Sequence, residues 1–157
     1  MINLNNWHTK RSIIYTALWV FILSMCIHVD LFSQQLNQES KTCIDRIISG
    51  DSEYGTIRNH DPEEMPISQA IVNYVRNIRS MDYSNCPEDF SSLFNAHILA
   101  WEELIPLTEK HLELRGEMHD VFNEIEKSGD ADQFNQGVKK IWETWGELEE
   151  WMKQHEE

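Results

Sequence analysis

Hydrophobic residues recur at alternating steps of three and four along most of the chain, which is the spacing of one apolar face of an α-helix. The longest such pattern predicts a single long helix from Asn85 to Lys127. One residue is dropped from the alternation beside Pro106, and a proline inside a helix kinks or breaks it. The positions on this face are Phe94, His97, Trp101, Leu104, Leu107, His111, Leu114, Met118, Val121 and Ile125.

Three shorter helices are predicted around this long one. The first covers Gln35 to Ser49 and is followed by Gly50 to His60, a segment rich in residues that favour turns. The second covers Ile67 to Met81. The last runs from about Asp132 to Lys153, after the glycine-containing turn at residues 128–130.

The absence of any useful run of alternating strand pattern indicates an all-α fold. Mostly short links favour an antiparallel four-helix bundle with one long kinked helix. If the long helix breaks at Pro106 or Gly116, the bundle has five helices. Gly137 and Gly146 lie inside the last predicted helix, where we expect them to permit close approach of a neighbour.

The N-terminal segment has the layout of a secretory signal peptide. Lys10 and Arg11 precede Ile13–Ile27, a run of fifteen residues without a charge. A spanning helix usually needs about 20 apolar residues, more than this run supplies. We therefore expect residues 1–33 to be a signal peptide, or alternatively a membrane anchor over residues 12–32, and residues 34–157 to form the bundle. The protein is then exported to the periplasm or the extracellular space.

The charge of the chain limits its partners. The formal net charge is −14, and removal of residues 1–33 leaves 11 basic and 26 acidic residues. Such an acidic chain repels phosphate backbones and anionic lipid surfaces. We expect no nucleic acid, membrane contact only through the N-terminal segment, and a protein partner or self-association.

Two of the three cysteines fall outside the apolar N-terminal run. In an oxidising compartment, Cys43 and Cys86 are expected to form one disulfide. The bridge would close a loop of about 43 residues, for which the chain-entropy model gives about 3–4 kcal/mol of stabilisation. The alternative is a buried free thiol at each position.

Histidines on the apolar face of the long helix are the first candidates for a cofactor site. His97 and His111 are separated by about 21 Å along a straight helix, so the two cannot bind the same metal ion. A ligand from another helix, or Met118, would have to complete a metal or haem site. A lone histidine on an apolar face is more often a hydrogen-bonded core residue. We therefore expect no metal and no cofactor, and keep a metal- or haem-binding bundle as the alternative.

The sequence carries no nucleophile motif, no glycine-rich phosphate loop and no Glu-x-x-His pair on the long or last helix. It assigns no catalytic residue and favours binding over catalysis. Among the tryptophans, Trp101 and Trp145 are expected in the core, whereas Trp142 and Trp151 lie at its edge and could contact a partner. The sequence thus predicts a small, exported, acidic bundle that acts by binding or structural interaction in the cell envelope.

Overall fold

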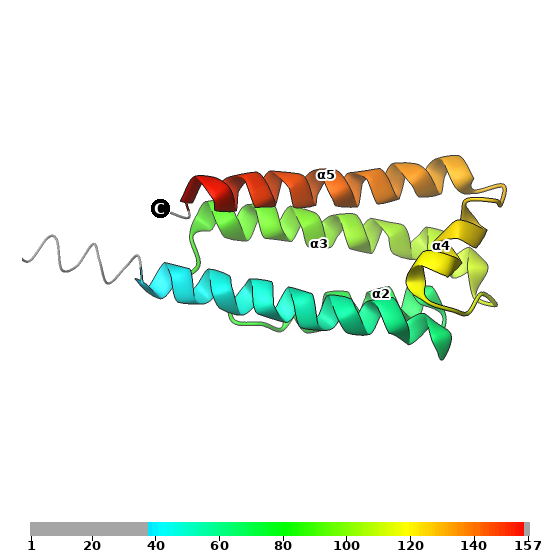
Figure 1. The fold of residues 1–157 in the computed structure, drawn as a ribbon, viewed down its shortest axis with the longest axis horizontal. Coiled ribbons are helices and arrows are strands. Elements are labelled where there is room, and N and C mark those ends of the chain that lie inside the picture. The colour runs from blue at the N-terminus through cyan, green and yellow to red at the C-terminus, as the bar shows by residue number, and fades with distance from the viewer. Residues whose placement is uncertain (1–37, 156–157) are drawn as a thin grey trace, which may run out of the picture. The chain divides into compact units, whose positions relative to one another are not determined.

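In a computed structural model, the described part of the chain, residues 38–155, is built from helices and their connections (Figure 1). The predicted N-terminal segment and the start of the first helix at Gln35 lie outside these residues. The helical elements, in chain order, are residues 38–60, the 3-10 turn η1 (Asp61–Glu63), α2 (Ile67–Arg79), α3 (Glu88–Thr108), the 3-10 turn η2 (Glu109–His111), α4 (Met118–Ile125) and α5 (Ala131–His155).

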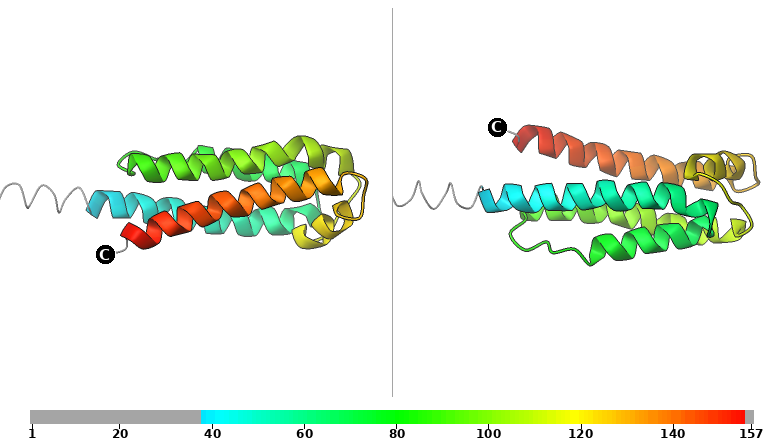
Figure 2. Two further views of the ribbon diagram at one scale, coloured as in Figure 1. Left: turned by 90° about the horizontal axis from the view of Figure 1, so that it is seen from above. Right: turned by 60° about the horizontal axis from the view of Figure 1, so that its bottom comes forward.

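Within the unit Ser40–Glu157, the 38–60 helix, α2, α3 and α5 follow one another in antiparallel directions (Figures 1 and 2). The 38–60 helix, α2, α3 and α5 lie along one another, and the short α4 lies across the end of the bundle where α3 ends (Figures 1 and 2). Within this unit α3 packs against both α2 and α5. No helix in the described range has the length and apolar composition needed to cross a bilayer.

The apolar faces of α2 and α5 lie where the periodicity predicts. On α2, Ile67, Ile71 and Ile78 are fully buried, as are Phe134 and Leu148 on α5. These side chains remove apolar surface from water, and that removal is the dominant favourable term in folding. The all-α prediction is confirmed for the described residues, and the five-helix alternative is the correct one.

The prediction of one long helix over Asn85–Lys127 is wrong, because α3 ends at Thr108 and α4 begins only at Met118. Pro106 remains inside α3 and removes one backbone donor near its end. The Thr108 hydroxyl donates to the carbonyl of Ile105 at 2.9 Å, three residues back. Gly116 then has a φ of 142°, a conformation that residues with a side chain rarely adopt. The chain therefore turns where the apolar spacing alone suggested continuity.

The predicted stop at Gly50 is also wrong, since the first helix continues through residue 60. Gly50 is buried, and the side chain of Met81 occupies the space beside it. A Cβ built on Gly50 would lie 2.3 Å from Met81 Cε and 2.6 Å from its Sδ. The glycine therefore allows the segment after α2 to pack closely, and it does not end the helix.

The two glycines of α5 differ in their surroundings. A Cβ on Gly137 would lie 2.7 Å from Leu104 Cδ1 of α3, so close approach is confirmed there. A Cβ on Gly146 would meet nothing within 4 Å. The expectation of close packing is therefore wrong for Gly146, which lies on the exposed side of the helix.

Candidate functional site

A cavity of about 440 Å³ opens near the end of the bundle that α4 covers. The end of the 38–60 helix, α3, the start of α4 and the middle of α5 all contribute to its wall. Ligand sites in proteins commonly occupy about 300–1,000 Å³. The lining residues are Asp51, Arg58, Asn59, His60, His97, Trp101, Glu117, Met118, His119, Phe122, Val138, Ile141, Trp142 and Trp145.

Arg58 places a guanidinium in the wall of this cavity. Its Cζ lies 3.7 Å from the centre of the Trp101 ring and 4.3 Å from that of Tyr74, both within the range of cation–π contacts. Its Nε is buried and has no hydrogen-bond partner, and among residues 38–155 Arg58 forms no ion pair within 4.0 Å. Burial lowers the pKa of Arg58 from its ordinary value, although arginine remains protonated in proteins. The cavity therefore contains a cation with an unused donor.

Asp51 and Tyr74 form a hydrogen bond beside this guanidinium. The Tyr74 hydroxyl donates to Asp51 Oδ1 at 2.5 Å. Burial, and then the charge of Asp51, raises the pKa of Tyr74 far above its ordinary value, so Tyr74 stays protonated. The hydrogen bond occupies one oxygen of Asp51 and fixes this carboxylate, which lies on the same helix as Arg58 and also lines the cavity.

His97 is buried between α3 and α5, and both of its ring nitrogens have partners. Trp101 Nε1 donates to His97 Nε2 at 3.2 Å. Because indole nitrogen can only donate, Nε2 must accept, and the proton of the neutral ring therefore lies on Nδ1. Nδ1 lies 3.2 Å from the Thr144 hydroxyl, and burial lowers the pKa of His97. The geometry is that of a neutral, hydrogen-bonded core histidine.

The other two cofactor candidates lie in different places. Met118 is buried at the start of α4 and lines the cavity together with His97. His111 lies in η2, outside the cavity lining, with Nε2 at 3.4 Å from Asp130 Oδ2. A hydrogen bond from Lys110, more than any other contact, lowers the pKa of Asp130. The structure therefore brings His97 and Met118 to one site and keeps His111 apart from them.

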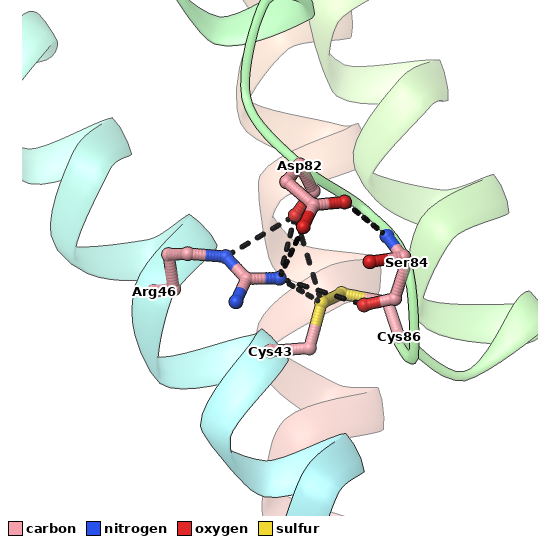
Figure 3. Close-up of polar contacts among 5 residues, drawn as sticks. All are labelled: Cys43, Arg46, Asp82, Ser84 and Cys86. Atoms are coloured by element: carbon pink, nitrogen blue, oxygen red, sulfur yellow. Dashed lines mark hydrogen bonds and ion pairs between the residues drawn. A yellow bond between two sulfur atoms is a disulfide. The ribbon is translucent and has the colours of Figure 1, made fainter.

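Cys43 and Cys86 lie at disulfide-bonding distance, with their Cα atoms 5.2 Å apart. The pair joins the 38–60 helix to the segment just before α3 (Figure 3). Arg46 extends this contact, because its Nη2 donates to the carbonyl of Asp82 at 2.7 Å. The backbone N–H of Ser84 donates to Asp82 Oδ1 at 2.8 Å, and hydrogen bonding to Ser84 lowers the pKa of Asp82. The cysteine pair is thus embedded in a polar network at one connection of the bundle.

The two tryptophans predicted at the edge of α5 have different environments. Trp142 is 69% exposed and stands at the rim of the cavity. Trp151 is half-buried, with its ring centre 5.6 Å from that of Phe90 and 4.1 Å from that of His155. Trp142 is therefore the one of the two that is free to contact a ligand or a partner.

Sequence reasoning missed Asp51 and Arg58 because it assigned residues 50–60 to a loop. The signal was present, since Cys43, Ile47, Asp51, Tyr54 and Arg58 follow one another at helical steps of four, four, three and four. Polar residues within such a pattern lie on the inner face of the helix and approach the core. No protein-family model, curated protein or solved structure matches this chain.

Proposed function

We propose that this chain is a binding protein of the cell envelope whose cavity takes a small amphipathic anion. The unpaired Nε of Arg58 is the observation that carries this proposal. A buried donor without a partner costs about 1–3 kcal/mol, and more when the group is charged. A carboxylate, sulfonate or phosphate of a ligand that reaches this guanidinium would add a charge-assisted hydrogen bond to it.

The rest of the wall supports a ligand with a flat apolar part. Trp101, Trp142 and Trp145 line the same cavity as Arg58, and aromatic side chains offer large apolar surfaces to planar ligands. The chain as a whole is strongly acidic, with a formal net charge of −14. Anions are therefore repelled from most of its surface. Among the residues that line the cavity, which also include Asp51 and Glu117, Arg58 supplies the positive charge that an anion would contact.

The test compares two dyes that differ in one charged group. The probe is 8-anilinonaphthalene-1-sulfonate, and its neutral counterpart is N-phenyl-1-naphthylamine, which has the same rings without the sulfonate. We expect Arg58→Gln to weaken sulfonate-dye binding on the order of tenfold or more, because a hydrogen bond to a charged group contributes about 1.5–3 kcal/mol. Binding of the neutral dye should remain nearly unchanged. Dye fluorescence, titrated in EDTA, measures both affinities.

The matched control is Arg76→Gln, which removes an exposed arginine of α2 outside the cavity lining. It should bind both dyes as the original protein does. Trp142→Ala, at an exposed position, should weaken both dyes without disturbing the core. Equal affinity for the two dyes in the original protein, or no effect of Arg58→Gln, would overturn the proposal.

The alternative function is a metal- or haem-binding bundle that uses His97 or His111. The shared position of His97 and Met118 in the cavity wall favours a His/Met haem site over one at His111. Ligation by His97 Nε2 would require the hydrogen bond from Trp101 to break. Reconstitution with haem followed by absorption spectroscopy tests it: a Soret shift lost in Met118→Leu would support this alternative, and no shift would remove it.

A further inference from the structure

Three potential metal ligands meet at the rim of the cavity. They are His60 at the end of the 38–60 helix, Glu63 in η1 and Glu117 just before α4, and their ligand atoms all lie within 4.8 Å of one another. His60 Nδ1 is 2.7 Å from Glu117 Oε1. We propose that these three residues form a binding site for one divalent transition-metal ion, with Zn²⁺ as the probe of choice. This proposal is independent of the proposed anion binding.

The backbone holds the ligand-bearing segments together without an ion. The N–H of Gly116 donates to the carbonyl of Pro62 at 3.1 Å. These two residues immediately precede Glu117 and Glu63, so the hydrogen bond fixes the turns that carry both carboxylates. Pro62 is buried, and Gly116 has the positive φ that its turn requires. Ligands held in this way lose little conformational entropy when they bind an ion.

The donor set determines the class of ion. One imidazole nitrogen and two carboxylate oxygens are a combination that Zn²⁺ accepts, at about 2.0–2.2 Å from each atom. Ca²⁺ and Mg²⁺ prefer oxygen ligands alone. Tetrahedral bonds of that length separate ligand atoms by about 3.3 Å. The pair formed by His60 Nδ1 and Glu117 Oε1, now 2.7 Å apart, must therefore open by about 0.6 Å. When Nδ1 binds the ion, the proton of the neutral imidazole lies on Nε2.

The position of the site leaves room for a further ligand. The side chain of His60 is 61% exposed and that of Glu117 is 33% exposed, so water reaches the ion. Three protein ligands with an open fourth position are typical of zinc sites that bind a further group. His60 and Glu117 also line the cavity. The open position of the ion is therefore at the cavity rim.

Metal titration of the full chain, oxidised at Cys43 and Cys86, tests the proposal. The protein is purified without a histidine tag, stripped with EDTA and titrated with Zn²⁺ by calorimetry in a buffer containing excess Mg²⁺. We expect one ion per chain, and visible absorption bands of low-coordinate Co²⁺ when that ion replaces Zn²⁺. His60→Asn and Glu117→Gln should each weaken Zn²⁺ binding at least tenfold, because loss of even an outer-shell partner costs about 10–100-fold in metal affinity. Glu63→Gln should do the same.

Two control variants distinguish the site from general attraction to an acidic surface. Glu64→Gln removes an exposed neighbouring charge, and His155→Asn removes a histidine at the C-terminal end of α5. Both should bind Zn²⁺ as the original protein does, and circular dichroism should show every variant folded. Failure of the original protein to bind one Zn²⁺, or equal binding by His60→Asn and Glu117→Gln, would overturn the site. Because the dye titrations are performed in EDTA, these results leave the anion proposal unaffected.

Discussion

The buried side chain of His97 on α3 is held in one protonation state by its neighbours. The donor from Trp101 requires a lone pair on Nε2, and burial disfavours the imidazolium. Thr144 supports the arrangement, because its hydroxyl can accept from His97 Nδ1 and also lies 3.0 Å from the carbonyl of Ile141. A histidine in this environment contributes stability only while it remains neutral.

The pH dependence of stability should therefore reveal His97. The pKa of His97 is lowered in the folded protein, so the unfolded chain takes up a proton near pH 6.5 that the folded chain does not. Stability from this residue is present above that pH and is lost as the pH falls, by at most about 1.4 kcal/mol per pH unit. Urea unfolding at pH 7.5 and 5.0 should show a larger loss for the original protein than for His97→Gln.

The control for that comparison is His155→Gln, which changes an exposed histidine at the end of α5. Its loss of stability on acidification should match that of the original protein. If His97→Gln shows the same loss as well, His97 is not the residue that titrates. Glutamine suits this position because its carbonyl oxygen can still accept the Trp101 donor.

Arg58 is a buried polar residue that the apolar periodicity of the sequence does not reveal. Helical periodicity is recognised from apolar residues. Because Asp51 and Arg58 are polar, the apolar pattern of the first helix ends before them, although the helix continues. Asp51 is covered by Tyr74 of α2, and Arg58 by Trp101 of α3. These contacts exist only in the folded protein. The disulfide pair was predictable from the two cysteines outside the apolar N-terminal run and the expected oxidising compartment, whereas the burial of Arg58 depends on the fold.

Within a helix, a glycine can either end the helix or allow a neighbouring side chain to approach closely, and Gly50 has the second role. Alanine at a helical position is about 1 kcal/mol more favourable than glycine. At Gly50 this gain is opposed by the contact of the new Cβ with Met81. We expect Gly50→Ala to be more favourable, by about 1 kcal/mol, in a Met81→Ala background than in the original protein, since overpacking costs about 1–3 kcal/mol. Urea denaturation of the four proteins measures this coupling.

Gly146 provides the matched control for that cycle. It lies inside α5 with nothing near its potential Cβ, so Gly146→Ala should raise the free energy of unfolding by about 1 kcal/mol in either background. If Gly50→Ala destabilises the protein equally with and without Met81, the cause is not that side chain. Such a result would favour the turn conformation expected from the sequence.

The sequence predicts best the helices whose apolar periodicity is not interrupted by a proline or by a glycine that adopts a turn conformation. For α2 the apolar face and the range agree with the structure to within two residues, and α5 differs by a similar margin. The interval between Thr108 and Met118 keeps the helical period and yet turns. There the backbone preferences of Pro106, Thr108 and Gly116 outweigh the spacing of the apolar side chains. Proline removes a helix hydrogen-bond donor, and the positive φ of Gly116 is incompatible with a continued α-helix.

The cysteine pair lies outside the cavity, nearer the start of the first helix. Cys43 is near the start of the described part of the first helix, whereas Asp51 and Arg58 follow about two and about four turns later. The bridge fixes the first helix to the segment before α3, and Arg46 adds hydrogen bonds to the same segment. It therefore constrains the pairing of helices without contributing a group to the candidate site.

Reduction should consequently lower stability while leaving the cavity able to bind. The cysteines are separated by 43 positions, and the chain-entropy model assigns a loop of that length about 4 kcal/mol. We expect a reductant to lower the urea midpoint of the original protein and to leave that of the Cys43→Ala/Cys86→Ala double variant unchanged. The mass of the oxidised chain should also increase by two hydrogens on reduction. Below the lowered midpoint, the sulfonate dye should bind as before, because Cys43, Cys86 and the neighbouring Arg46 do not belong to the cavity lining. Free thiols in protein isolated from its native compartment would contradict both the bridge and the proposed export.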